Sequence, residues 1–181
     1  MLICHFLIGL PASGKSTLAS QVAAFGNCRI VSTDRIREQL FGNEIIQGDW
    51  QTIQREVISQ MGGAIAAGES IIYDATNAKR VWREDLLDTI ARQFKGEQLR
   101  WIAWYVTTSV ETCKEWNQGR SRKVPDEVIE AMAVSLKEVP PTAQEGFIAV
   151  VAVNPRRLSK EEVGEKIRKV LSRAMEKIAN G

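Results

Sequence analysis

Cysteine and histidine are scarce in this sequence. Its 181 residues include only three cysteines and one histidine. The cysteines are widely spaced, odd in number and without a CxxC pair, which excludes a disulfide framework and a zinc-binding pattern. We therefore expect free thiols at Cys4, Cys28 and Cys113. The single histidine, His5, falls in an apolar segment, and we expect it to be buried and hydrogen-bonded rather than to bind a ligand.

Long hydrophobic runs, internal repeats and low-complexity linkers are also missing. No apolar stretch approaches the roughly 20 residues of a membrane-spanning helix. The apolar residues 1–10 lack the basic n-region of a signal peptide and run directly into a glycine-containing turn. The composition, 44% hydrophobic and 25% charged, is that of an ordinary soluble domain. These features predict a cytoplasmic protein without a membrane partner, folded as a single domain over residues 1–181.

The net charge of +2 is small but unevenly distributed. Residues 156–181 contain eight Lys or Arg and four Asp or Glu, a net charge of +4, which leaves −2 for the rest of the chain. A basic tail of this kind fits two interpretations, contact with nucleic acid or the solvated face of an amphipathic helix. We favour the amphipathic helix, which is the commoner case.

Short β-branched apolar segments alternate with longer segments of helical period. This alternation is the signature of βαβ units and predicts an α/β fold, a five-stranded parallel sheet sandwiched by helices. The expected strands are residues 2–8, 29–32, 70–74, 99–106 and 147–153. The expected helices are residues 15–24, 34–41, 50–67, 80–94, 110–116, 125–137 and 160–178. In the helix 80–94, apolar residues at helical spacing predict a buried stripe formed by Trp82, Leu86, Leu87, Ile90 and Phe94.

The five tryptophans raise the question of base stacking. Trp82, Trp101 and Trp104 fall in core-facing patterns, so we expect them to pack in the interior. Only Trp50 and Trp116 lie near loops that a ligand can reach.

The strongest motif is GLPASGKST at residues 9–17, which satisfies GxxxxGK[ST] between the first expected strand and the first expected helix. Such a loop lets successive backbone N–H groups and the positive end of a helix face one polyphosphate. We expect Lys15 to reach the β and γ phosphates and Ser16 to ligate Mg²⁺. The alternative is a plain strand-to-helix turn that happens to contain glycines. The predicted ATP-binding residues of the loop are Gly9, Pro11, Ala12, Ser13, Gly14, Lys15, Ser16 and Thr17.

A second motif, STDRIR at residues 32–37, follows the second expected strand. In an open parallel sheet, ligands bind at the carboxyl ends of the strands. Asp34 and Arg37 are three residues apart, so both can point from one helix face at the same ligand. Asp34 could accept the proton of an attacking hydroxyl, and Arg37 could hold an anionic substrate group. The spacing is equally compatible with a plain role, in which Asp34 favours the helix start and Arg37 pairs with it.

A third motif, IIYDATN at residues 71–77, ends the third expected strand. Asp74 stands where a carboxylate would organise the waters of a magnesium ion. Thr76 or Asn77 is expected to cap the next helix. Positive charge in the first turn of a helix opposes the helix dipole, so we expect Arg83 to face a phosphate or a site carboxylate and to bind substrate. Arg80 fits solvent exposure equally well.

Residues 117–125, NQGRSRKVP, form the most loop-like interruption of the pattern. A charge run is usually a solvated face. Opposite a phosphate loop, however, cationic groups can close over the triphosphate and exclude water. We therefore predict that residues 117–125 form a small mobile lid, in which Arg120 and Arg122 bind the nucleotide and Arg122 acts on the transferring phosphoryl group.

Two missing features narrow the class of nucleotide-binding protein. No NKxD-type guanine motif occurs, which disfavours a GTPase, and no second long nucleotide-binding segment indicates a motor. The chain has the length of a small kinase. Lys15, Asp34 and Arg122 are then the candidate catalytic residues.

The order GLPASGKST, STDRIR, IIYDATN and CKEWNQGRSRKVPDEVIEAM resembles the polynucleotide kinase-like branch of P-loop phosphotransferases, from residue 2 to about residue 132. The resemblance implies a P-loop NTPase fold with ATP and Mg²⁺ as cofactors and transfer of the γ-phosphate to the 5′-hydroxyl end of a polynucleotide. It makes Asp34 the general base and Arg37 the arginine that binds a substrate phosphate. The residues it assigns to ATP, magnesium and the lid are Lys15, Ser16, Arg120 and Arg122.

The acceptor has an alternative in the same resemblance. The branch also includes tRNA-linked, sugar-nucleotide and antibiotic kinases, and the chain before residue 156 has no net positive charge to line a long polyanion path. A small-molecule kinase acting on a nucleoside, sugar or antibiotic is the second reading. An ATP-binding regulatory switch without transfer is the third.

Overall fold

The computed structural model describes residues 1–43, 46–120, 122–155 and 157–179. Ser121, inside the predicted lid, and Arg156, the first residue of the basic tail, lie outside the described residues, as do residues 180–181 at the end of that tail. Five parallel strands form one sheet in the order β2-β3-β1-β4-β5, as predicted. Their bounds are β1 Leu2–Gly9, β2 Cys28–Ser32, β3 Ser70–Asp74, β4 Leu99–Val106 and β5 Phe147–Val153.

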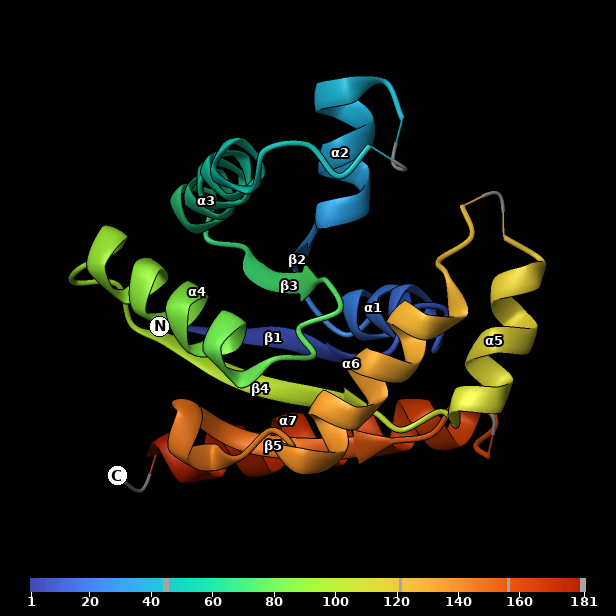
Figure 1. The fold of residues 1–181 in the computed structure, drawn as a ribbon. Coiled ribbons are helices and arrows are strands. Elements are labelled where there is room, and N and C mark those ends of the chain that lie inside the picture. The colour runs from blue at the N-terminus through green and yellow to red at the C-terminus, as the bar shows by residue number, and fades with distance from the viewer. Residues whose placement is uncertain (44–45, 121, 156, 180–181) are drawn as a thin grey trace.

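Helices cover both faces of this sheet (Figure 1). Helices α1 (Lys15–Ala23) and α7 (Lys160–Ala179) pack on one face, and α3 (Trp50–Ala66), α4 (Arg80–Gln93) and α6 (Asp126–Glu138) pack on the other. The remaining helices are α2 (Thr33–Phe41), α5 (Val110–Gln118) and the short 3₁₀ helix η1 (Ala143–Glu145), which the sequence did not predict. In the described part of the chain, no helix combines the length and the apolar character needed to cross a membrane.

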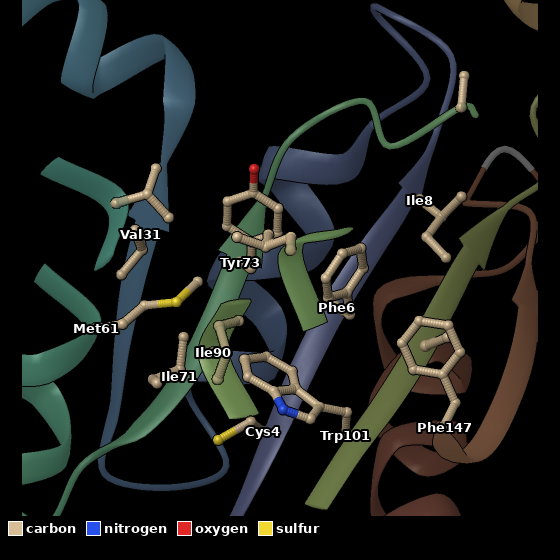
Figure 2. Close-up of a cluster of buried hydrophobic side chains, with 14 of the residues drawn as sticks. Cys4, Phe6, Ile8, Val31, Met61, Ile71, Tyr73, Ile90, Trp101 and Phe147 are labelled. Carbon is tan, nitrogen blue, oxygen red and sulfur yellow. The ribbon is translucent and has the colours of Figure 1, made fainter. Parts of the chain in front are cut away.

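The period of the strands explains the two cores. Successive side chains of a strand point to opposite faces, so β1 contributes Phe6 to the core beneath α3, α4 and α6, and Leu7 to the core beneath α1 and α7. Figure 2 shows Phe6 at the centre of the first core, and its ring centroid lies 5.1 Å from that of Tyr73, 5.9 Å from that of Trp101 and 5.4 Å from that of Phe147. Both faces of the central strand are therefore sealed from water.

In the predicted stripe of α4, the first residue faces outward, and Leu87 and Phe94 are only partly buried against the core. Leu86 and Ile90 are buried, but the side chain of Trp82 is 45% exposed, with the ammonium group of Lys79 4.9 Å from its ring centroid. The expectation that Trp82 packs in the interior is wrong because Arg83, one residue later, occupies the inward position of this first turn. Trp101 and Trp104 are buried as predicted.

His5 is buried, as the sequence predicted, against the second core. Its side chain is 2% exposed, and Nδ1 accepts a hydrogen bond from Nε1 of Trp104 at 3.0 Å. Burial lowers the pKa of His5 to about 4, because the charged imidazolium would lose its hydration. The three cysteines are free thiols, also as predicted.

Candidate active site

The residues between the end of β1 and the start of α1 form a tight loop. Ala12 and Gly14 have left-handed backbone conformations, with φ of 58° and 95°. The carboxyl end of β1 is held by a bond from the Gly9 N–H to the carbonyl oxygen of Thr76 at 3.1 Å. A Cβ atom on Gly9 would lie 3.0 Å from the carbonyl oxygen of Val106, so no larger residue fits there without displacing β4. The loop thus has the strand-turn-helix context that its motif requires.

Lys15 lies inside this loop at the start of α1. Its ammonium Nζ donates a hydrogen bond of 2.7 Å to the carbonyl oxygen of Leu10, and the residue is only 8% exposed. Burial lowers the pKa of Lys15, while the carboxylates of Asp74 and Asp34 oppose that shift. An anionic ligand at the loop would favour the charged ammonium in the same way.

The sheet order brings Asp74 to the phosphate loop. Strand β3, which ends at Asp74, pairs directly with β1, and the hydroxyl of Ser16 donates a hydrogen bond of 2.7 Å to Oδ2 of Asp74. Asp74 is 6% exposed and Ser16 is in the first turn of α1. A hydroxyl and a carboxylate that share one hydrogen bond can also share one hard cation.

Asp34 lies in the first turn of α2 and is surrounded by three arginines. Its Oδ1 accepts hydrogen bonds from Nη1 of Arg37 at 3.0 Å and from Nη1 of Arg122 at 2.5 Å. Nη2 of Arg120 lies 3.8 Å from Oδ2. One carboxylate cannot neutralise three guanidinium groups, so this cluster has a surplus of positive charge that suits a further anion.

Two polar side-chain atoms at this site are buried without a hydrogen-bond partner among the described residues. They are the hydroxyl Oγ of Ser13, in the phosphate loop, and Nε of Arg37. Buried polar groups usually have a hydrogen-bond partner, so the lack of one at these two atoms needs an explanation. A ligand bound between the phosphate loop and Asp34 would offer both atoms a hydrogen-bond partner.

The loop after α5 begins later than the sequence predicted. Helix α5 continues through Gln118, so Asn117 is helical, and it is 1% exposed. Its Nδ2 donates to the carbonyl oxygen of Val124 at 2.7 Å, and its Oδ1 accepts from the Val124 N–H at 3.0 Å. This pair of bonds fastens the base of the loop. Arg122, in the same loop, contacts Asp34 of α2, and Figure 1 shows the segment that links α5 to α6. Sequence reasoning treated Asn117 as loop because nothing local reveals its partner seven residues later.

The structure does not bring Arg83 to this site. Its side chain is fully buried and bonded to Glu145, so it has no surface on which to bind a substrate. Arg80 is exposed and pairs with Glu84 at 2.7 Å. The expectation that Thr76 or Asn77 caps α4 is also wrong, because the N-cap is Lys79 without a side-chain cap.

A recess of about 160 Å³ opens beside Asp34, Asp74 and Ser16. Its walls carry the hydroxyls of three serines and charges of both signs, including those of Arg35 and Glu38. No aromatic side chain is among its lining residues. The recess therefore connects the phosphate loop with Asp34 through a polar space.

A family model described as an AAA domain matches residues 4–139, which include every element of this site. The chain belongs to this AAA-domain family. A search of curated protein sequences finds no match to it.

Solved structures share the fold of this AAA-domain protein. A gluconokinase from Sinorhizobium meliloti has a TM-score of 0.60 and 17% identity, and the match covers 97% of this chain and 95% of that one. A sugar kinase from Janibacter sp. has a TM-score of 0.64 and 18% identity, with 95% of each chain covered. A chain of the Pnkp1/Rnl/Hen1 RNA repair complex has a TM-score of 0.60 and 19% identity, but the match covers 76% of this chain and 44% of that one. The AAA-domain protein thus has the predicted α/β fold, a five-stranded parallel sheet between helices, and shares it with these structures.

Proposed function

We propose that this protein is a phosphotransferase that moves the γ-phosphate of ATP to a hydroxyl acceptor. One observation carries the proposal: Asp34, a carboxylate outside the phosphate loop, accepts a hydrogen bond from Arg122 and lines the recess that also reaches Ser16 and Asp74. A protein that only binds ATP has no need of a base at that place. A kinase needs one beside the transferring phosphoryl group.

The nucleotide is held by the phosphate loop and the lid. Backbone N–H groups of residues 9–17 and the ammonium of Lys15 bind its phosphates. The phosphates of ATP compete with Asp34 for the guanidinium groups of Arg120 and Arg122, which both contact its carboxylate. We propose that the lid predicted at residues 117–125 closes over the phosphates from the base that Asn117 fastens to Val124.

Ser16 and Asp74 fit the expected magnesium ion. Mg²⁺ is commonly held by one or two protein oxygens together with phosphates and waters. Among the described residues, no group of three or more His, Cys, Asp or Glu side chains could hold a metal ion. We therefore expect phosphates of ATP and waters to supply the remaining ligands. When bound, it neutralises charge on the phosphate oxygens.

Asp34 acts as the general base. Its carboxylate takes the proton of the acceptor hydroxyl as the acceptor oxygen forms its bond to the γ-phosphorus and the bond to the bridging oxygen of ADP breaks. Arg37 stays beside Asp34 and binds an anionic group of the acceptor, for which its buried Nε has a free donor. Arg122 stabilises the charge on the transferring group. Arg83 has no part in substrate binding.

For the acceptor we propose the 5′-hydroxyl end of a polynucleotide, supported by the order of motifs and by the surplus of arginine around Asp34. A small polyhydroxylated molecule is the second candidate. The recess favours it specifically, because about 160 Å³ suits a small acceptor and its walls offer no aromatic platform for a base.

The test is transfer of labelled γ-phosphate from ATP to a panel of acceptors. The panel holds 5′-hydroxyl RNA, 5′-hydroxyl DNA, nucleosides, sugars and amino-alcohols, and the Lys15→Ala variant is the matched control. An oligonucleotide labelled better than its nucleoside supports the polynucleotide acceptor, whereas a sugar or nucleoside labelled better supports the small acceptor. Tight ATP binding without any labelled acceptor would contradict the kinase and leave a regulatory switch.

A further inference from the structure

Arg83 is fully buried, and every nitrogen of its guanidinium group donates hydrogen bonds, although it lies outside the site described above. We propose that Arg83, together with Glu145, is a positioning residue for phosphoryl transfer, which holds the loop after Asp74 and the helix after the lid in one fixed arrangement. The proposal rests on the proposed function, because its effect is measured on the transfer reaction.

The first observation is the ion pair itself. The side chains of Arg83 and Glu145 are both 0% exposed. Nε of Arg83 donates to Oε2 of Glu145 at 2.5 Å, and Nη2 donates to Oε1 at 2.9 Å. Oε1 also accepts from the backbone N–H of Thr142 at 2.9 Å, which fixes the turn before β5. The pair is therefore bidentate and geometrically constrained.

The remaining N–H groups of Arg83 bind backbone carbonyl oxygens of two other segments. Nη1 donates to the carbonyl oxygens of Asn77 and Ala78 at 3.2 and 3.1 Å, and Nη2 donates to that of Val139 at 3.3 Å. A guanidinium group has five N–H donors, and all five are used. Asn77 and Ala78 follow β3, whereas Val139 ends α6. One side chain thus joins three segments that are distant in sequence.

The loop that Arg83 holds is connected to the phosphate loop. Asn77 has a left-handed backbone, with φ of 53°, and its Nδ2 donates to the carbonyl oxygen of Leu7 in β1 at 2.7 Å. The neighbouring carbonyl of Thr76 accepts from the N–H of Gly9, the first residue of the phosphate-loop motif. Displacing the carbonyl of Asn77 would therefore disturb both Asp74, three residues earlier, and the entrance of the phosphate loop.

The other segment leads to the lid. Helix α6 begins directly after the lid residues 119–125 and packs against α5, where Lys114 forms ion pairs with Asp126 and Glu130. Because Arg83 binds the carbonyl at the far end of α6, it fixes the position of that helix relative to β3. The buried side chain of Arg83 would then hold the arginines of the lid and the carboxylate of Asp74 at fixed positions relative to each other.

Stability alone does not account for this arrangement. Replacing a buried ion pair with uncharged groups of similar volume is often neutral for folding, since the pair loses its hydration. The five directional hydrogen bonds of Arg83 fix the relative positions of the segments that they join. A displacement of about 1 Å at a reacting centre can cost on the order of 100-fold in rate.

The experiment compares two double variants of the full chain, each of which removes one ion pair that involves an arginine of α4. Arg83→Met with Glu145→Gln removes the buried pair without leaving a lone charge. Arg80→Met with Glu84→Gln removes the exposed pair of the same helix and is the matched control. Urea unfolding establishes that each is folded at the assay temperature. Initial rates of γ-phosphate transfer then give kcat and KM for the acceptor labelled by the wild type.

We expect the buried double variant to lose 10-fold to 100-fold in kcat, with KM for ATP changed less than about threefold, and the control to match the wild type. Hydrogen exchange should rise at residues 75–78 and 122–125 in the folded variant and stay unchanged in the control. The single variant Arg83→Lys should also have a low kcat, because an ammonium group cannot make the five hydrogen bonds of the guanidinium group. If the double variant does not fold, Arg83→Lys alone takes its place, because it keeps the buried charge pair while losing the fork of hydrogen bonds.

A folded variant with wild-type kcat and unchanged exchange overturns the proposal. So does a loss of activity that only follows the unfolded fraction. If the wild type itself labels no acceptor, the proposed function has failed, and the exchange comparison still decides whether Arg83 holds the two segments.

Discussion

His5 makes the pH dependence of stability directly predictable. It is the only histidine of the chain, and its pKa falls from 6.5 to about 4 on burial. Between these two values the unfolded chain binds a proton that the folded protein does not, so the free energy of unfolding must decrease as the pH falls through this window. Above pH 6.5 the contribution is complete.

The change in the free energy of unfolding can be calculated from the shift in the pKa of His5. A difference of about 2.5 pKa units corresponds to a total loss of about 3 kcal/mol, at about 1.4 kcal/mol per unit, which is reached only below the folded pKa of about 4. At pH 5, one unit above the folded pKa, the expected loss relative to pH 7.5 is about 2 kcal/mol. Protonation of Nδ1 would also remove the acceptor for Trp104.

The assay is urea unfolding at pH 7.5 and pH 5 for the wild type and for His5→Asn. The amide oxygen of asparagine can accept the Trp104 hydrogen bond and does not titrate in this range. Carboxylates titrate in both proteins, so the difference between their pH slopes isolates His5. We expect the variant to lose about 2 kcal/mol less than the wild type over this interval. Equal slopes would refute the reasoning, since they would mean that His5 is protonated in the fold as easily as in water.

Three further predictions concern the proposed reaction. Lys15→Ala should nearly abolish transfer while circular dichroism shows an intact fold, and unchanged transfer would contradict the phosphate site. Asp34→Asn should lower the rate on the order of 10²-fold to 10⁴-fold, with far less change in calorimetric affinity for a non-hydrolysable ATP analogue; a collapse of that affinity would instead place Asp34 in the nucleotide or metal site. Arg122→Ala should lower the rate at saturating ATP by about 10³-fold to 10⁵-fold, and Arg122→Lys should rescue little, so a full rate in Arg122→Ala would reduce the lid to a solvated loop.

The sequence predicted the elements closely because each is encoded locally. The period of the apolar residues identified all five strands and all seven α-helices, with ends that agree to within two residues. Alternation of strands and helices implied a parallel sheet, and the GxxxxGK[ST] motif placed the phosphate loop at its first crossover. The helix α5 ended two residues later than predicted, since a buried Asn117 has no local pattern to distinguish it from a loop residue.

Partners distant in sequence were decided by the tertiary structure. The sequence made Arg83 a candidate for an anion at the site, and the fold gave it Glu145, 62 residues away, in the interior. It suggested Asp34 as a base, and the fold placed Arg122, 88 residues later, on the same carboxylate.

By itself, then, the sequence determined the phosphate loop, the strands and the helices, because periodicity and loop chemistry depend on neighbours within a few residues. Only the tertiary structure decided that Asp74 meets Ser16, that Arg120 and Arg122 meet Asp34, and that Trp82 faces outward. The physical reason is the strand order β2-β3-β1-β4-β5 and the packing of helices on it, which set distances that no local pattern contains.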